Sequence, residues 1–352
     1  MVNMDCLIIL LLRTKMRDIK NVNVDDEAPI IIAGSKRGGT TLLRRIINAH
    51  SSITIPPPDW IYNSIYPYLY SYGDLATVQN ISELIRDIIE IPNIAHYWNV
   101  DKSIAEIFSL LPEKSYRGVL VAVFRLYATT RFWGSKVPNN CFWIKEIHHD
   151  FPKARFLFLY RDGRDASLEM VETQASGWPY NLYVACIWWK KYMQAILNSK
   201  KHLKPNSYLD IYYEELVSEP KNVVNRICKF LNIDYESSML QYHHHKPEAF
   251  LDRIIHQRSH NPITPSYIGV HRSLPVHDRQ LQITVMDDLL KRLDYTVKEK
   301  PRSIPLWERE WYLEEQRITS EQQRQFKQRL MARKGKAWND KTRIKFLKNI
   351  TN

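Results

Sequence analysis

The feature that most constrains this chain is a glycine-rich loop between a strand pattern and a helix pattern. Residues 29–33 (PIIIA) form a short apolar, β-branched run bounded by proline and glycine, which is typical of a buried strand. The loop GSKRGGTT follows at residues 34–41, and apolar residues then recur at helical spacing at Leu42, Leu43, Ile46 and Ile47. This order predicts the opening unit of a parallel α/β sheet.

Further strand and helix patterns alternate along the chain. Strands are predicted at residues 154–160 (ARFLFLY) and 207–213 (SYLDIYY), with a short extended segment at 133–138. Helical patterns cover roughly residues 75–130 and 219–232. Strands that alternate with helices indicate parallel pairing with right-handed crossovers. We therefore expect an α/β three-layer sandwich with a central parallel sheet and a P-loop-like phosphate-binding loop.

The charge of the chain is concentrated at one end. Of a net charge of +12 over 352 residues, residues 322–352 contribute ten Lys and Arg against one acidic residue. The high net charge therefore describes a C-terminal arm, predicted to be helical and solvated, and no nucleic-acid partner is expected. The expected organisation is a flexible lead at 1–27, one α/β domain at 28–295 and a basic helical extension at 296–352.

Cysteine and histidine usage indicate neither a disulfide framework nor a metal site. The four cysteines are too far apart for a C-x-x-C pattern and predict reduced, mostly buried thiols: Cys6, Cys141, Cys186 and Cys228. The consecutive histidines at 243–245 cannot aim three rings at one ion, so we expect them on the surface. The apolar run at residues 7–12 is too short for a signal peptide or a membrane span. The expected location is cytoplasmic.

The loop itself predicts an anion site without nucleotide hydrolysis. The G-x-x-x-x-G spacing presents backbone N–H groups and a helix N-terminus to an anion. Thr40 stands where the loop of a nucleoside triphosphatase carries its Lys, which argues against ATP or GTP hydrolysis. Lys36 and Arg37 lie inside the loop instead, which suits an anion on a nucleotide 5′-phosphate. The alternative is a plain strand-to-helix turn.

The run GSKRGGTTLLRRIINAH, followed by a proline-rich turn, closely resembles the 5′-phosphosulfate loop of the sulfotransferase family, usually G-S-P-R-S-G-T-T. The resemblance implies a sulfotransferase that uses 3′-phosphoadenosine 5′-phosphosulfate (PAPS) as co-substrate, without a metal. It also implies that the 5′-phosphosulfate is held by Arg37, Gly38, Gly39, Thr40 and Thr41. Lys36 in place of Pro and Gly38 in place of Ser remove no backbone donor.

Arg161 is the candidate for a second anion contact. It closes a buried strand at the carboxyl edge of the sheet, where ligands bind in open α/β folds, and Asp162 can cap the next helix. The alternative is an ion pair with Asp162 or Asp165. FLFLYRDGRDAS resembles the family's 3′-phosphate element, in which a helical Ser follows the Arg by eight residues. Here that position is Glu169, which we expect to turn away from a phosphate, and Ser167 is the remaining candidate hydroxyl.

Two weaker matches add candidates. Residues 212–220 and 230–233 resemble the family's tyrosine-bearing strand and following helix, closest to the protein-tyrosine sulfotransferase branch. There Tyr213 would reach the nucleotide; a core aromatic is the alternative. Residues 258–259 and 266–272 resemble a loop that closes over the nucleotide. That match implies Arg272 as a phosphate contact and Ser259 as an active-site hydroxyl.

Sulfuryl transfer needs cations aimed at the leaving oxygen and a base for the acceptor hydroxyl. Lys136 in WGSKVP resembles the family's catalytic Lys; a solvated surface Lys is the alternative. Pro58 stands where the family often carries a catalytic Glu, so the adjacent Asp59 is the leading candidate base and His50 the alternative. The acceptor class stays open among peptidyl tyrosine, carbohydrate, lipid and small molecules.

Two rival functions remain at this point. A P-loop nucleotide kinase requires the lysine that Thr40 replaces. A non-catalytic nucleotide- or nucleic-acid-binding protein would use the basic arm instead of a transfer site.

Overall fold

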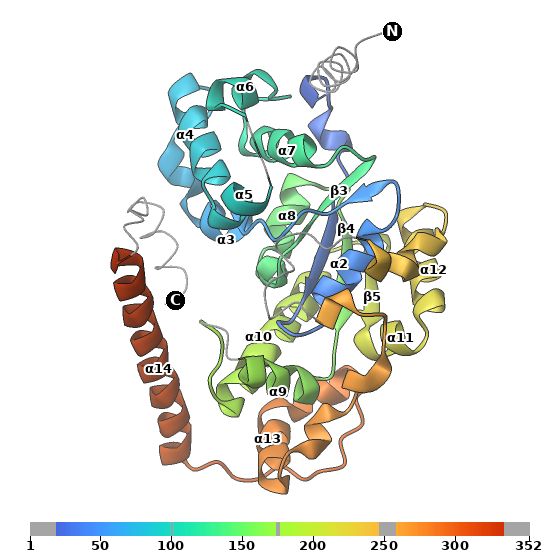
Figure 1. The fold of residues 1–352 in the computed structure, drawn as a ribbon, viewed down its shortest axis with the longest axis vertical. Helices are drawn as coiled ribbons and strands as arrows, with labels where there is room; N and C mark the ends of the chain where they lie inside the picture. Colours follow the sequence, from blue (N-terminus) through green and yellow to red (C-terminus); the bar gives the residue numbers. More distant parts are fainter. Residues whose placement is uncertain (1–18, 99, 101, 174–176, 246–257, 334–352) are drawn as a thin grey trace.

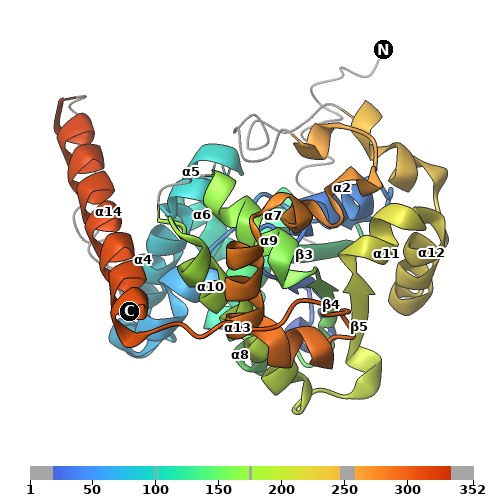
Figure 2. The same ribbon diagram turned by 90° about the horizontal axis from the view of Figure 1, so that it is seen from below.

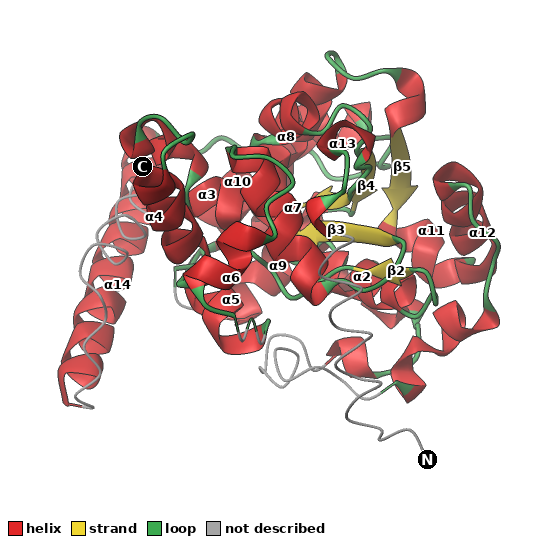
Figure 3. Ribbon diagram, turned by 90° about the horizontal axis from the view of Figure 1, so that it is seen from above, coloured by secondary structure: helices red, strands yellow, loops and turns green. Residues whose placement is uncertain are grey.

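A five-stranded parallel sheet forms the centre of the molecule (Figure 3). The computed structural model describes residues 19–98, 100, 102–173, 177–245 and 258–333. The strand order is β2-β3-β1-β4-β5, with bounds Ile53–Thr54, Phe132–Lys136, Ile30–Gly34, Arg155–Tyr160 and Tyr208–Tyr212. The strands predicted from apolar runs are confirmed. The short edge strand β2 was not predicted, because two residues carry no readable periodicity.

Helices cover both faces of the sheet, as Figures 1 and 2 show. Ile30 and Ile32 of β1 pack with α2 (Thr40–Asn48), α11 (Tyr213–Ser218) and α12 (Pro220–Leu231). Ile31 and Ala33 of the same strand face the larger core, which α7 (Tyr116–Tyr127) and α10 (Leu182–Lys200) help to form. Because side chains alternate along a strand, one apolar run supplies both cores. The expected three-layer sandwich is confirmed.

Further α-helices within the described residues are α3 (Ile61–Ser64), α4 (Val78–Ile89), α5 (Pro92–Tyr97), α6 (Ile104–Ser109), α8 (Ile144–Asp150), α9 (Gly163–Thr173), α13 (Val276–Arg292) and α14 (Leu306–Arg333). Short 3₁₀ helices are η1 (Val24–Asp26), η2 (Tyr66–Tyr72), η3 (Pro138–Phe142), η4 (Pro205–Ser207), η5 (Ser237–His244), η8 (Pro265–Tyr267) and η9 (Val270–Ser273).

The long helical stretch expected at residues 75–130 is divided into α4, α5, α6 and α7. A residue that favours the start of a helix lies at each of the three boundaries between these helices. Pro92 lies in the first turn of α5, Ser103 forms a capping box with Glu106, and the Ser115 hydroxyl caps α7. Proline and N-caps end one helix and begin the next, whatever the overall helical propensity of the stretch.

Helix α14 lies within the C-terminal arm expected at residues 296–352, of which residues 334–352 lie outside the described part of the chain. Figure 1 shows α14 along one side of the molecule. It contacts the segment that leads into α10. The amide Nδ2 of Asn181 donates to the carbonyl of Tyr312 over 2.8 Å, and the Tyr183 and Tyr312 rings stack at 5.3 Å. Trp307 and Trp311 remain exposed on this helix. Within the described part of the chain, no helix is both long enough and apolar enough to cross a membrane.

The expectations for cysteine and histidine hold where they can be checked. Cys141, Cys186 and Cys228 are free thiols and buried, whereas Cys6 lies outside the described residues. Burial raises the pKa of Cys186 to about 12, so this thiol stays protonated. His244 and His245 are exposed at the end of η5, in agreement with a surface cluster.

Candidate active site

The glycine loop connects the carboxyl end of β1 to the N-terminus of α2. Gly39 has φ of 91°, and a Cβ there would lie 2.5 Å from Cδ2 of the Tyr213 ring. Only glycine satisfies both the left-handed backbone and this close approach. Because Gly39 precedes α2 and has no side chain to cap it, the first N–H groups of the helix are presented toward the loop. Arg37 also has a positive φ, of 57°, a strained conformation that functional loops often contain.

Lys36 points from the loop toward two tryptophans that the sequence did not single out. Its ammonium lies 4.4 Å from the ring centre of Trp188 and 5.1 Å from that of Trp178. Burial lowers the pKa of Lys36 to about 7. The faces of the two rings favour the charged form of the Lys36 ammonium. The sequence could not reveal this contact, because Trp178 and Trp188 lie more than 140 positions after Lys36.

Arg161 lies at the end of β4 with only 2% of its surface exposed, and it is in contact with the loop. Its Nη1 donates to the carbonyl oxygen of Arg37 over 2.7 Å. Its guanidinium lies 4.4 Å above the ring of Tyr213, the same ring that packs on Gly39. The structure therefore brings together Arg37, Gly39, Arg161 and Tyr213, which the sequence had assigned to one nucleotide site.

The expectation that Glu169 turns away from this cluster is wrong. Its Oε1 accepts from Nη2 of Arg161 over 2.7 Å, and its Oε2 from Nη2 of Arg37 over 2.9 Å. Arg258, which the sequence did not assign, lies 3.2 Å from the same carboxylate. Burial by itself would raise the pKa of Glu169, but the charges of Arg161 and Arg37 outweigh it and hold this pKa below its ordinary value. Buried guanidiniums need a counter-charge, and Glu169 supplies it.

Ser167 is not brought to the arginine cluster. Its hydroxyl donates to the carbonyl of Arg164 over 3.2 Å and accepts from Nε2 of Gln282 over 3.0 Å. It thus faces α13, on a different side of α9 from Glu169, as two residues of helical rotation require. Arg161 does not pair with Asp162 or Asp165 either, because Asp162 holds Arg164 and Asp165 holds His271.

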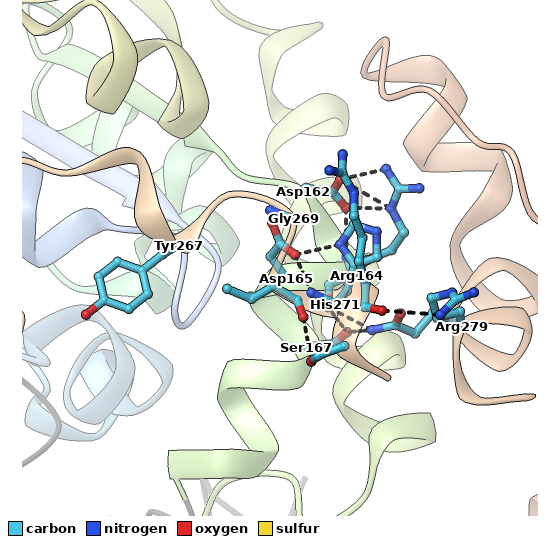
Figure 4. Close-up of polar contacts among 12 residues, drawn as sticks. Asp162, Arg164, Asp165, Ser167, Tyr267, Gly269, His271 and Arg279 are labelled. Carbon is cyan, nitrogen blue, oxygen red and sulfur yellow. Dashed lines mark hydrogen bonds and ion pairs between the residues drawn. The ribbon is translucent and has the colours of Figure 1, made fainter. Parts of the chain in front are cut away.

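Asp165 fixes the turn predicted to close over the nucleotide (Figure 4). Its carboxylate accepts from the N–H groups of Gly269 and His271 over 2.6 and 2.9 Å, and from Nδ1 of His271 over 2.6 Å. One possible metal-ligand atom from each of Asp162, Asp165 and His271 lies within 4.8 Å of the other two, a spacing compatible with a metal ion. These atoms are engaged in the hydrogen bonds of the turn and in the Arg164 pair, so the cluster acts as a clamp. Arg272 projects from the exposed side of this turn.

Loss of the Asp165 carboxylate should loosen this turn. These three hydrogen bonds hold the pKa of Asp165 below its ordinary value despite burial, which alone would raise it. We expect Asp165→Ala to lower the free energy of unfolding by about 2–4 kcal/mol at pH 7, because buried donors lose their acceptor. A lowered pKa adds stability above the unfolded value near 4, and this stability is lost as pH falls through the folded pKa. Chemical denaturation at pH 7 and below pH 4 measures both effects.

Glu172→Ala, an exposed carboxylate on the same helix α9, is the matched control. It should change the unfolding free energy by less than about 0.5 kcal/mol. Equal effects of the two substitutions would contradict the assignment of Asp165 as a clamp.

Lys136 ends β3 next to the loop. Its side chain is 2% exposed, and its Nζ donates to Oγ1 of Thr41, in the first turn of α2, over 3.2 Å. β3 pairs with β1 so that Lys136 lies opposite Ile32 at the carboxyl side of the sheet. This placement excludes the alternative of a solvated surface lysine and puts a positive charge beside the N-terminus of α2.

Asp59 is buried on the opposite face of β3. Its Oδ2 accepts from the hydroxyl of Ser135 over 2.5 Å, and its Oδ1 accepts from the N–H of Ile61 over 3.0 Å. It borders a small cavity of about 10 Å³ that Ile31 and Trp133 also line. Burial raises the pKa of Asp59, and the hydrogen bond from Ser135 and the charge of Lys136 only partly offset it. A raised pKa is a property that general bases share.

His50 is placed away from the loop. It follows the C-terminal end of α2, and its Nε2 lies 2.9 Å from the carbonyl of Asp234, past the end of α12. Its Nδ1 accepts from the N–H of Ser52 over 3.0 Å. Because α2 and α12 run back from the carboxyl ends of the strands, His50 lies at the amino edge of the sheet. The alternative that His50 is the base is therefore not supported.

Ser259 is buried beside α2. Its backbone carbonyl accepts from Nη1 of Arg45, whose Nη2 donates to the carbonyl of Tyr242 over 3.0 Å. Arg45 lies one helical turn after Thr41, so the two side chains share a face of α2. Ser259 thus lies beside the last turn of α2, to which Arg45 belongs.

The fold and site define an α/β protein with a glycine-rich loop between β1 and α2 and a cluster of buried basic side chains at the carboxyl edge of its parallel sheet. A model of the Sulfotransferase family matches residues 29–237. The chain therefore belongs to the sulfotransferase family, as the motifs had indicated.

Individual relatives are similar at low identity. Protein-tyrosine sulfotransferase 2 of Gallus gallus is 25% identical over 220 residues, which cover 61% of this chain and 54% of that protein. Protein-tyrosine sulfotransferase A of Caenorhabditis elegans is 23% identical over 229 residues, covering 60% and 52% respectively. The chain thus spans about half the length of these two relatives.

Two solved structures share the fold. The sulfotransferase domain from the curacin biosynthetic pathway superimposes with a TM-score of 0.53 at 22% identity, covering 77% of this chain and 99% of that one. The sulfotransferase domain of the Synechococcus PCC 7002 olefin synthase gives 0.50 at 18% identity, covering 78% and 98%.

Proposed function

We propose that the chain transfers the sulfuryl group of PAPS to an acceptor hydroxyl by in-line displacement. The observation that carries this proposal is the contact of Lys136 with Thr41 at the N-terminus of α2. It places a cation and helix N–H groups together, as charge developing on a leaving oxygen requires. Buried polar atoms also fit such a nucleotide: Nε of Arg161 and the hydroxyl of Ser35 have no hydrogen-bond partner among the described residues.

The proposed roles follow the positions of the side chains. Residues 37–41 bind the 5′ anion through N–H groups and the Arg37 guanidinium, while Arg161 and Tyr213 hold the other end of the nucleotide. Lys136 stabilises the leaving oxygen, and Asp59 accepts the acceptor proton, with Ser135 orienting its carboxylate. Bound PAPS supplies the activated sulfuryl group.

The acceptor we propose to test first is a tyrosyl hydroxyl in a polypeptide. It is favoured by the similarity to proteins named protein-tyrosine sulfotransferases, which extends over some 60% of this chain. Incubation with PAPS and separate pools of peptides, carbohydrates, lipids and small alcohols, read by mass spectrometry, identifies the pool that gains a sulfuryl group. Gain in a non-peptide pool alone would contradict the tyrosyl proposal.

Thermal unfolding with nucleotides tests the donor. Adenosine 3′,5′-bisphosphate at about one hundred times its Kd should raise the Tm by about 5 °C, because a ligand that binds only the folded state adds about 2.7 kcal/mol. ATP with Mg²⁺ at the same concentration should raise it less, since Thr40 replaces the lysine of nucleotide kinases. Stabilisation by ATP with Mg²⁺ alone would favour the kinase alternative and reject the sulfotransferase assignment.

A further inference from the structure

The carboxylate of Glu169 lies among guanidiniums from three separate parts of the chain. Arg37 comes from the glycine loop, Arg161 from the end of β4, and Arg258 from the segment before η8. The Glu169 side chain is 5% exposed, and its two oxygens lie 2.7–3.2 Å from these three groups. These contacts form a network of charged hydrogen bonds at the carboxyl edge of the sheet.

The cluster keeps its capacity to bind an anion. Three guanidiniums against one carboxylate leave an excess of two positive charges. The buried Nε of Arg161 has no hydrogen-bond partner in the described part of the chain. Arg258 is 47% exposed and covers the ring of Tyr267 at 4.3 Å, so one edge of the cluster faces solvent.

Glu169 also determines which anions fit. A phosphate and a carboxylate accept from the same guanidinium donors, and two anions within hydrogen-bond distance repel each other. A ribose hydroxyl can instead donate to a carboxylate. Dinucleotide-binding proteins use this difference, because an acidic residue receives a ribose hydroxyl where an arginine would accommodate a phosphate. Glu169 occupies the helix position that resembles the 3′-phosphate contact, eight residues after Arg161.

We propose that Glu169 makes the nucleotide site nearly indifferent to a 3′-phosphate. A 5′-nucleotide with a free 3′-hydroxyl then binds about as well as its 3′-phosphorylated form. The donors accepted therefore include adenosine 5′-phosphosulfate as well as PAPS. In transfer from adenosine 5′-phosphosulfate, the S–O bond to the 5′-phosphate breaks, the acceptor oxygen forms the new S–O bond, and adenosine 5′-monophosphate leaves. This inference rests on the proposed function, since it concerns the selectivity of the same site.

Binding measured by calorimetry on the full chain tests the proposal without any substitution. The Kd values of adenosine 3′,5′-bisphosphate and adenosine 5′-monophosphate should agree within about threefold. A 3′-phosphate held by two charged hydrogen bonds would instead give a preference of about 100-fold or more. That larger preference in the unaltered protein would overturn the proposal.

A second test replaces Glu169 by its neutral isostere, glutamine. Glu169→Gln should tighten binding of the bisphosphate about tenfold or more and change that of the monophosphate less than threefold, because one repulsive charge is removed. Glu172→Gln, exposed on the same helix, should leave both Kd values unchanged. If the ratio of the two Kd values is unchanged in a folded Glu169→Gln variant, the role of Glu169 is rejected, but the proposed function is not. If neither nucleotide binds the unaltered chain, the proposed function itself fails.

Discussion

Asp59→Asn should lower kcat for sulfuryl transfer about 10²–10⁴-fold, the range expected when a general base is removed. An amide of the same shape cannot accept the acceptor proton. In the unaltered protein kcat should fall as pH drops through the pKa of Asp59, which burial raises. The asparagine variant should lose this acidic limb, so a pH–rate profile distinguishes a base from a residue that only supports the fold.

The same substitution should affect stability little. Since burial raises the folded pKa of Asp59, the folded state holds the proton more tightly than the unfolded chain. Ionisation therefore costs stability as pH rises from the unfolded value near 4 through the folded pKa. Asparagine carries no charge, so the variant should not lose stability at pH 7, and its unfolding free energy should lack this fall with rising pH.

Asp150→Asn is the matched control for this experiment. Asp150 is also buried, accepts from the hydroxyl of Tyr62 over 2.8 Å and has a pKa raised by burial, but it lies on α8 within the core. Its substitution should leave kcat within a few-fold. Similar losses of activity in both variants would mean that Asp59 acts through the core rather than as a base.

Lys136→Ala should lower kcat about 10²–10³-fold while the Kd of adenosine 3′,5′-bisphosphate changes only a few-fold. The expected loss is that of one preorganised donor aimed at developing charge. Lys136 is well placed for this because its Nζ contacts Thr41 in the first turn of α2. Single-turnover kinetics with saturating PAPS separate the chemical step from binding.

Two further variants sharpen the Lys136 experiment. Lys145→Ala removes an exposed lysine from α8 and should leave kcat unchanged. Lys136→Arg keeps the charge but not the compact ammonium, so partial activity is expected. Unchanged turnover in Lys136→Ala would remove this residue from the mechanism, whereas weakened nucleotide binding alone would make it a binding residue.

Local pattern was sufficient for the loop and for every strand of the sheet except β2. The run at residues 29–33 predicted β1, and the alternation of Ile30 to Ala33 between two cores follows from the geometry of one strand. The glycines of the loop are needed by the backbone itself, since Gly39 adopts a positive φ. Arg161 was predicted at the carboxyl edge because a strand that ends in a polar residue places that residue there.

Tertiary contacts decided the rest of the site. The sequence determined the fold class, the glycine-rich loop and the place of Arg161 at the carboxyl edge, because these depend on residues close together in the chain. Glu169 and Arg37 are 132 positions apart, and only the packing of α9 beside the loop made the carboxylate a partner of the arginines. The direction of α2 likewise carried His50 to the amino edge, away from the loop. A buried charge selects its partner from whatever the fold brings within hydrogen-bond distance, and residue spacing along the chain does not contain that information.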